Sequence, residues 1–226
     1  NRVLTLIDVG PALIGTAGIV DKSGRVWIGF EDGSIAVHFQ NHIQRYTRSE
    51  GLPAALIRAI YEDADGTIWV GSSAGLSRLQ NGRFITMTAV TADVPLRDVV
   101  AVLVDRNDYL WLATSAGVVR LRRSDAMRVT LDGAFSGTFV RYDASDGIPG
   151  NTVVPKHPAA TVAADGKLWF IASHGVAIID TKAVDTQAVL LPLRIEGGVA
   201  DRRAFDAMPG LTLPPRTSTL EINYLV

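Results

Sequence analysis

The chain has 226 residues, of which 47% are hydrophobic and 7% aromatic, so it carries enough apolar side chains for a sizeable core. Its 22 basic and 23 acidic residues give a net charge of −1 and form no run of either sign, which argues against a nucleic-acid-binding surface and a polybasic membrane patch. The absence of cysteine excludes disulfides and cysteine-ligated metals, and no apolar run reaches the roughly 18 residues of a membrane-spanning helix.

In chain order, residues 1–9 (NRVLTLIDV) predict a strand. A repeat follows, marked by the four tryptophans of the chain, Trp27, Trp69, Trp111 and Trp169. The first three are 42 residues apart (69 − 27 and 111 − 69), and a glycine lies six residues after each of the four. A period in the forties, built of short apolar runs and turn residues, is typical of one blade of a β-propeller. Residues 1–9 are then the last strand of a preceding blade.

The second repeat shows what one blade contains. Residues 57–62, 67–71, 76–79 and 83–86 are short, β-prone runs, and Asp65-Gly66 separates the first two. Asp-Gly between two such runs favours a two-residue hairpin turn in which both residues have positive φ. The equivalent pairs in the other repeats are Ser23-Gly24, Asn107-Asp108 and Asp165-Gly166. Asp108 replaces the glycine and should be the most strained. The predicted fold class is all-β, with about four four-stranded antiparallel meanders that form a partial propeller.

Two parts of the chain depart from the repeat. The spacing between the last two tryptophans is 16 residues longer (58 − 42), and residues 123–137, with a possible share in 151–158, form the predicted insertion. After Asp180 the pattern stops, and the polar residues 181–188 are predicted to be a linker. Residues 191–196 and 218–224 alternate as strands. We therefore predict a partial propeller over residues 1–189 and the truncated start of a second β-domain over residues 190–226.

The repeats resemble a known family. Two segments are similar to the two-component regulator propeller repeat, residues 50–84 (EGLPAALIRAIYEDADGTIWVGSSAGLSRLQNGRF) and residues 164–179 (ADGKLWFIASHGVAII). A Y_Y_Y β-sandwich usually follows that propeller, and its opening strands are similar to residues 213–224 (LPPRTSTLEINY). The resemblance implies the sensor half of a bacterial membrane receptor, whose histidine kinase or diguanylate cyclase lies beyond a membrane helix. Its known ligands in gut bacteria are oligosaccharides. The sequence departs from the repeat at Asp108, at Ile171 and in the enlarged connection before the fourth blade.

The chemistry-bearing residues mostly have a structural interpretation. Each tryptophan could stack on a sugar, but its fixed place in every second strand predicts a core residue. Residues 63–66 (DADG) resemble the first positions of a calcium loop, but the later ligands are absent, which favours a hairpin turn. The four histidines are scattered, and no motif of a hydrolase, metalloprotease, P-loop or dinucleotide site occurs. We predict no catalytic residue, metal or cofactor in this chain.

A ligand site can still be placed from the blade geometry. In a meander blade the first strand lines the central channel, and the loops after the second and fourth strands open on one face. The polar residues predicted there, and hence the candidate ligand-binding residues, are Arg58, Ser73, Ser115, Asn151, Lys156 and His174. The alternative is that the serines only complete backbone turns.

Three classes of function follow. The favoured one is the periplasmic ligand-sensing domain of a membrane receptor, which binds a small-molecule or oligosaccharide signal and meets the membrane only through segments outside this chain. Propellers of the family that the chain resembles more often have seven blades, so we do not expect four blades to close a ring. A homodimer is therefore expected through the exposed strand edges. The alternatives are a propeller enzyme (a lyase or glycosidase) and a protein-interaction scaffold. The enzyme's candidate carboxylates, Glu62, Asp63 and Asp105, are expected at exposed hairpin ends. Because the chain begins at Asn1 and shows no signal peptide, we expect a piece of a longer protein.

Overall fold

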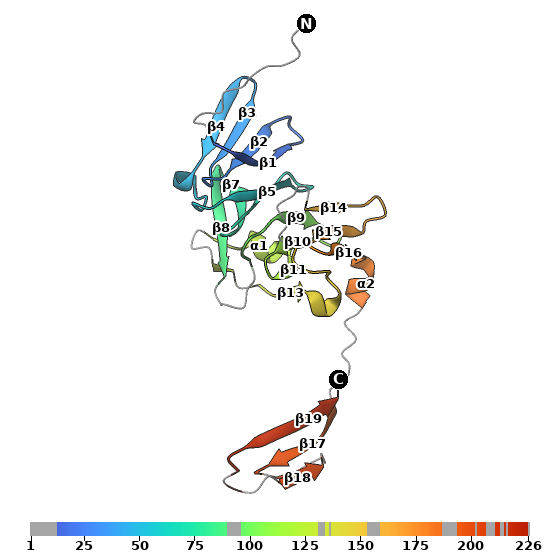
Figure 1. Cartoon of the computed structure of the whole chain (residues 1–226). Coiled ribbons are helices and arrows are strands. Elements are labelled where there is room, and N and C mark those ends of the chain that lie inside the picture. The colour runs from blue at the N-terminus through green and yellow to red at the C-terminus, as the bar shows by residue number, and fades with distance from the viewer. Residues whose placement is uncertain are drawn as a thin grey trace. The chain divides into compact units, whose positions relative to one another are not determined.

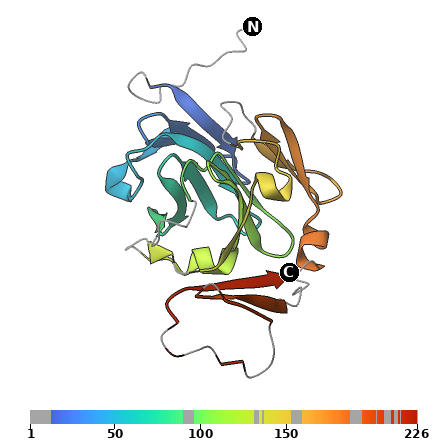
Figure 2. The same ribbon diagram turned by 60° about the horizontal axis from the view of Figure 1, so that its bottom comes forward.

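The structure is a computed structural model that describes residues 13–89, 96–130, 134–135, 137–152, 159–186, 194–201, 203–206, 211–212, 215 and 217–225. The chain divides into two compact units, Asn1–Thr181 and Lys182–Val226. The first unit is a succession of antiparallel sheets, coloured from blue to orange in Figures 1 and 2. The boundary predicted at residues 189/190 falls outside the described residues and stays a prediction.

Each repeat forms one sheet, so the four predicted blades are present as an all-β propeller. Blade 1 consists of β1 (Gly15–Val20), β2 (Val26–Phe30), β3 (Ile35–Phe39) and β4 (His42–Tyr46). Blade 2 consists of β5 (Ile57–Glu62), β6 (Ile68–Ser72), β7 (Gly75–Gln80) and β8 (Arg83–Ala89). Blade 3 consists of β9 (Ala101–Val104), β10 (Tyr109–Thr114), β11 (Gly117–Arg122) and β13 (Phe139–Tyr142). Blade 4 has three strands in the described part of the chain, β14 (Ala160–Val162), β15 (Leu168–Ala172) and β16 (Gly175–Ile179).

The turn between the first two strands of each blade differs from the prediction. The Gly24 amide donates to the Asp21 carbonyl at 2.9 Å and the Asp21 amide to the Arg25 carbonyl at 2.9 Å, so the loop is a type I turn followed by one residue with positive φ. Only that last residue has positive φ, with Gly24 at +80°, Gly66 at +87°, Asp108 at +62° and Gly166 at +88°. The predicted two-residue turn is wrong here. It occurs instead between β7 and β8, where Asn81 and Gly82 have φ of +50° and +76°.

An aspartate side chain supports this turn in blades 1 to 3. Asp63 Oδ1 accepts the amides of Asp65 and Thr67 at 3.2 and 3.1 Å, which holds the turn, and its Oδ2 accepts the indole N–H of Trp69 at 2.8 Å. The same indole bond joins Asp21 to Trp27 at 2.8 Å and Asp105 to Trp111 at 2.7 Å. The turn and the core tryptophan are thereby fixed together in each of these three blades.

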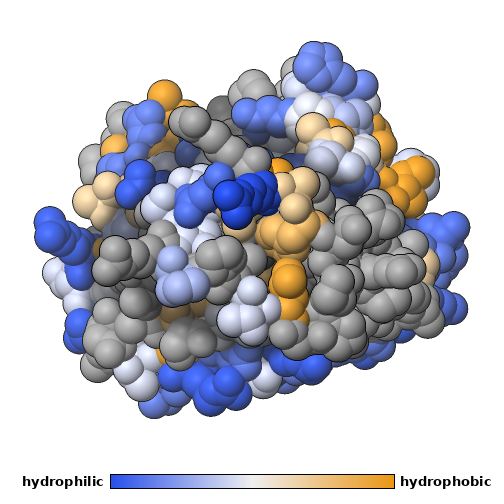
Figure 3. All heavy atoms as spheres, turned by 90° about the horizontal axis from the view of Figure 1, so that it is seen from below, coloured by the Kyte–Doolittle hydropathy of each residue, from blue (hydrophilic) through white to orange (hydrophobic). Residues whose placement is uncertain are grey.

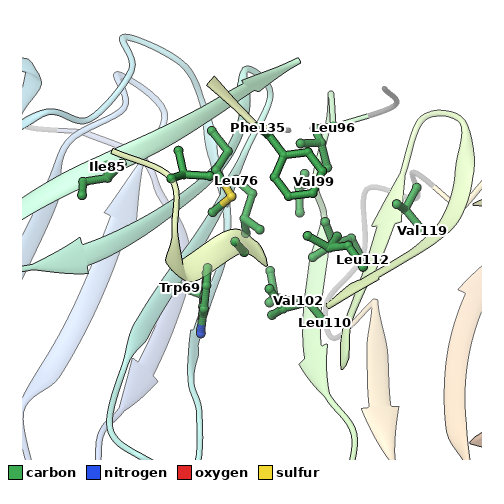
Figure 4. Close-up of a cluster of buried hydrophobic side chains, with 14 residues drawn as sticks. Trp69, Leu76, Ile85, Leu96, Val99, Val102, Leu110, Leu112, Val119 and Phe135 are labelled. Atoms are coloured by element: carbon green, nitrogen blue, oxygen red, sulfur yellow. The ribbon is translucent and has the colours of Figure 1, made fainter. Parts of the chain in front are cut away.

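The core lies between neighbouring blades. Trp27, Ile35, Val37 and Tyr46 of blade 1 form one cluster with Ile57, Ile60, Ile68, Val70 and Phe84 of blade 2. A second cluster joins blades 2 and 3, and Figure 4 shows Trp69, Leu76 and Ile85 on one side of it and Val102, Leu110 and Leu112 on the other. Gly29 and Gly71 allow this approach, because a Cβ at either position would lie 2.4 Å from an atom of the next blade. The prediction of a tryptophan core is confirmed for Trp27, Trp69 and Trp111, which are at most 1% exposed.

The prediction of a core tryptophan is wrong for the fourth blade. Trp169 is 40% exposed. Position 163, where the other blades have the aspartate, holds Ala163, although its turn has the same backbone bonds. Its neighbours on the same face, Ile171, Val176 and Ile178, are also 37–52% exposed. The indole of Trp169 therefore lacks both the aspartate that binds the other three and the packing that buries them.

The predicted insertion has secondary structure in its described residues. It contains α1 (Arg123–Met127) and β12 (Ala134–Phe135), and β12 pairs parallel with β8 as a fifth strand of the preceding blade. The predicted linker begins with a helix, α2 (Thr181–Thr186). This helix was not predicted, because the sequence analysis noted only that the strand pattern ends after Asp180.

The second unit is a three-stranded antiparallel sheet in the order β18-β17-β19. Its strands are β17 (Arg194–Ala200), β18 (Arg203–Asp206) and β19 (Leu220–Leu225). The two predicted strands correspond to β17 and β19, shifted by up to four residues, whereas β18 was not predicted. On the face drawn in Figure 3, hydrophilic residues alternate with small groups of hydrophobic ones.

Candidate functional site

The inner strands of all four blades line one pocket of about 630 Å³. Its wall is mostly apolar, with residues from β1, β5, β9 and β14. Among the described residues of this wall Arg58 is the only charged one, and Thr16 and Tyr61 carry hydroxyl groups. Burial raises the pKa of the Tyr61 phenol, so this group is neutral at physiological pH; it interacts with the Val104 backbone and packs against the core between blades 2 and 3. The pocket can therefore hold a small molecule with apolar surface and a few polar groups.

Two β-bulges direct polar side chains toward this pocket. The pairing of β5 with β6 skips a residue between Ile57 and Ala59, and the residue left out of register is Arg58. The pairing of β1 with β2 skips Thr16 in the same way, and the Thr16 hydroxyl donates to the Gly29 carbonyl at 3.1 Å. A bulge changes the direction of a side chain and is common next to binding sites. These bulges were not predicted, because the alternation of apolar residues in 57–62 is too weak to show a skipped position.

Arg58 reaches across to the entry of the next blade. Its Nη2 lies 3.2 Å from Asp98 Oδ1, and the two side chains are 26% and 35% exposed. The Arg58 Nε is buried and has no hydrogen-bond partner. Asp98 has a positive φ of +50°, an uncommon conformation for a residue with a side chain. The guanidinium is thus held at the edge of the pocket by a single, half-exposed ion pair.

Ser73 and Ser115 lie beside this pair. The Ser73 carbonyl accepts the Asp98 amide at 3.3 Å, and the amide and hydroxyl of Ser115 donate to the Arg97 carbonyl at 3.3 and 3.4 Å. The structure thus brings Arg58, Ser73 and Ser115 together around residues 97–98. The turn role of the serines is also present, because the Ser73 amide donates to the Leu56 carbonyl at 3.0 Å and so closes its own blade.

Asn151 and His174 form a second group on blade 4. The Ser173 hydroxyl accepts the Asn151 amide at 3.0 Å and lies 3.3 Å from His174 Nδ1. The neighbouring Thr152 donates to the Thr114 carbonyl at 2.6 Å, which connects this group to the loop of Ser115. The sixth predicted residue, Lys156, lies outside the described residues.

The carboxylates considered for an enzyme have structural partners. Asp63 and Asp105 each hold the indole of a core tryptophan, and Asp63 also accepts Arg123 Nε at 2.8 Å. Glu62 accepts the Lys22 amide at 2.8 Å from the neighbouring blade. Asp63 is buried, so the expectation of an exposed hairpin carboxylate is wrong for this residue. Its burial follows from its bond to Trp69.

Within the described ranges, no group of three or more histidine, aspartate or glutamate residues could hold a metal ion. None of the helices described is long and apolar enough to cross a membrane.

Comparison with known families supports the repeat. Residues 51–74 match the family model of the two component regulator propeller, which confirms the resemblance of this repeat. The Y_Y_Y part of the resemblance has no such support and stays a prediction. A comparison with curated proteins found no match.

Solved structures share the fold. The extracellular domain of the hybrid two component system BT3049 from B. thetaiotaomicron has a TM-score of 0.73 at 18% identity, over 94% of this chain and 29% of that one. The extracellular domain of BT4673 from the same organism has a TM-score of 0.61 at 18% identity, over 76% and 24%. A streptogramin B lyase has a TM-score of 0.55 at 18% identity, over 79% and 54%. This chain spans less than a third of the length of the two extracellular domains.

Proposed function

We propose that this chain is part of the periplasmic, ligand-sensing region of a bacterial membrane receptor of the two-component type, and that it binds a small-molecule signal. The match of residues 51–74 to the two component regulator propeller supports this assignment, as does the fold shared with two extracellular domains of such systems. Oligosaccharides are the first ligand class to test, because a sugar ring combines apolar faces with hydroxyl groups.

The observation that carries the proposal is the pocket with Arg58 at its edge. A guanidinium with five donors suits hydroxyl and carboxylate oxygens alike. The apolar wall contributes area for the faces of a ring, and the loop residues Ser73 and Ser115 lie at the same rim. Asn151 and His174 form a separate polar group on blade 4, which in our proposal belongs to the same binding surface.

Signalling then requires two states that the ligand binds unequally. In our proposal the ligand changes the arrangement of the propeller relative to the second unit, and residues 181–190 transmit the change. A kinase or cyclase in another part of the receptor would supply the output.

An enzymatic role has less support. Glycosidases need paired carboxylates at a substrate, and Asp63 and Asp105 are instead bonded to core tryptophans. The likeness to a streptogramin B lyase is one of fold. We therefore propose that this chain binds its ligand without converting it.

Isothermal titration calorimetry of the 226-residue chain with a panel of neutral and acidic oligosaccharides tests the proposal. We expect Arg58→Ala to weaken binding by about tenfold, because a charge-assisted hydrogen bond is lost. The fold should persist, since a half-exposed ion pair contributes about 0–1 kcal/mol. Arg128→Ala, which removes a 72%-exposed arginine of the insertion, is the matched control.

Asn151→Ala and His174→Ala extend this test to blade 4. Unchanged affinity in these two variants and in Arg58→Ala would place the site elsewhere. A panel without any binding would contradict the sensing of oligosaccharides, and turnover of a panel member would favour the enzyme.

A further inference from the structure

Arg58 stands at a position where the repeat does not require a charge. It lies eleven residues before the tryptophan of blade 2 (69 − 58), and the residues at the same distance in blades 1 and 3 are Thr16 and Val100 (27 − 16 and 111 − 100). All three residues line the pocket. A threonine and a valine serve this place in the neighbouring blades, so the charge of Arg58 points to a partner and not to the architecture of the blade.

The partner that the structure gives Arg58 is incomplete. Arg58 Nη2 donates one hydrogen bond to Asp98 Oδ1 at 3.2 Å, and the two side chains are 26% and 35% exposed. The Nε atom of Arg58 is buried and has no hydrogen-bond partner among the described residues. A guanidinium offers five N–H donors in a planar fork, and a carboxylate can accept two of them at once. Asp98 therefore satisfies only part of the guanidinium.

The backbone of Asp98 also carries a cost. Its φ of +50° lies in the left-handed region, which is unfavourable for a residue with a Cβ. Its amide donates to the Ser73 carbonyl at 3.3 Å, and the amide of Val99 donates to the Ser72 carbonyl at 3.0 Å. The backbone that enters blade 3 thus holds the Asp98 carboxylate beside blade 2. Both members of the ion pair are kept in a conformation that is not their best one.

We infer that the ligand of this pocket carries a carboxylate, which binds the guanidinium of Arg58 in place of Asp98. The inference rests on the proposed function, because it names the ligand class of the same site. Nη2 belongs to both forked edges of a guanidinium, so a carboxylate that binds two nitrogens needs the atom that Asp98 now contacts. Two carboxylates on one guanidinium repel each other. Asp98 is thus an internal competitor that the ligand releases.

The wall of the pocket favours an anion over a neutral group. It consists mostly of apolar residues such as Val102 and Leu103, and Arg58 is its one charged residue in the part of the chain that the structure describes. A ligand that covers the guanidinium removes it from water, and a cation without water needs a counter-charge. A hydroxyl would leave the charge uncompensated. A carboxylate supplies the charge and two acceptors, while the rest of the ligand contacts the apolar wall.

Matched pairs of probes test this ligand class. One pair is trigalacturonate and its methyl ester, and the other is phenylacetate and phenylacetamide, so the carboxylate comes either from a sugar or from a compact apolar molecule. Calorimetry of the 226-residue chain should show about tenfold tighter binding of the acid in one pair, and that pair identifies the source. Arg58→Gln should abolish the preference for the acid. Arg97→Gln, which removes an exposed arginine next to Asp98, is the matched control and should keep it.

Asp98→Asn distinguishes competition from positioning. Asparagine has the same shape and tolerates a positive φ, so the fold should persist. We expect the affinity for the acid to rise about two- to fivefold, because a half-exposed ion pair is a weak competitor. The affinity for the neutral probe should stay the same. Added to Arg58→Gln, Asp98→Asn should have no effect on the acid, since the competition acts through Arg58.

The inference and the proposed function fail under different outcomes. If neither these probes nor the oligosaccharide panel bind, both fail. If the ester and the amide bind as tightly as the acids, or if Arg58→Gln keeps the preference for the acid, a ligand site remains and the carboxylate is contradicted. Weaker binding of the acid by Asp98→Asn would show that Asp98 orients Arg58 and does not compete. Nuclear magnetic resonance gives a second readout, because the Arg58 Nε–H signal should move downfield with the acid and not with its neutral counterpart.

Discussion

At the scale of single residues, the aspartate six positions before each of the first three tryptophans is the key contact. In blade 1, burial opposes the ionisation of Asp21, but hydrogen bonds from Trp27 and Arg25 outweigh it and hold the pKa of the carboxyl below its usual value. The folded state therefore favours the carboxylate. This contact could have been predicted from the sequence, since Asp21, Asp63 and Asp105 each lie six residues before a tryptophan. Ala163 holds the same position before Trp169. That break could have indicated the different environment of Trp169.

Acid should weaken the fold through this carboxylate. Because the pKa of Asp21 is depressed in the folded state, the carboxylate contributes fully to the free energy of unfolding at a pH well above the unfolded pKa of about 3.9. This contribution is lost as the pH falls from about 3.9 toward the folded pKa. We expect Asp21→Asn to lower the free energy of unfolding at pH 7 by about 2 kcal/mol and to flatten its decline between about pH 5 and 3. Urea denaturation at a series of pH values measures both.

Asp165→Asn is the matched control for Asp21→Asn. Asp165 lies in the turn of blade 4 and is 57% exposed. In this blade Ala163 occupies the position that Asp21 has in blade 1, so no carboxylate binds the indole there. We expect a change below about 0.5 kcal/mol there. Equal effects at Asp21 and Asp165 would show that the turn, and not the indole bond, determines the stability.

At the scale of elements, the insertion after β11 is attached to blade 2 by a buried arginine. Arg78 donates from Nε to the Ala126 carbonyl at 3.3 Å and from Nη2 to the carbonyls of Met127 and Val129 at 2.9 and 2.7 Å. These carbonyls lie at and just after the end of α1, where backbone acceptors lack the usual helical donor; the Ala126 carbonyl also accepts the Val129 amide at 3.3 Å. The short helix and β12 are thereby held against β7 and β8.

Removing this arginine should loosen the insertion. We expect Arg78→Met to lower the free energy of unfolding by about 3 kcal/mol, because buried carbonyls lose their donors. Arg83→Met on β8 removes one exposed bond to the Ser49 carbonyl and should cost less than about 1 kcal/mol. Hydrogen exchange should show the amides of α1 becoming accessible only in the Arg78 variant. Similar behaviour of the two variants would contradict a structural role of the buried guanidinium.

The same elements show where sequence reasoning ends. The positions of the blades followed from local spacing, because each tryptophan, glycine and turn recurs within its own unit. The insertion was visible as 16 additional residues, but its attachment depends on Arg78, which lies 48 to 51 residues away from its partners in sequence. The face of the candidate site could be placed from the meander geometry. The bulge that directs Arg58 and its pairing with Asp98 depend on neighbouring blades, which a single repeat does not reveal.

At the scale of the whole molecule, the two units differ in how they bury their cores. The large clusters of the propeller use residues between Trp27 and Phe135, all within Asn1–Thr181. The second unit has one sheet of three strands, which has no second layer in the described residues. Three strands are the fewest that can be stable alone in water, and they need a buried hydrophobic face for it. The propeller should therefore depend little on the second unit.

A chain that ends at Thr186, after α2, tests this independence. We expect its melting temperature to lie within about 2 °C of that of the full chain, since a loss of 1 kcal/mol shifts a domain of this size by about 2–4 °C. Residues 187–226 alone should lack cooperative unfolding by circular dichroism, for want of a second layer. A fall of the melting temperature well beyond that range would show that the second unit stabilises the blades. A signal that passes between the units would then have to change an interaction that also stabilises the propeller without ligand.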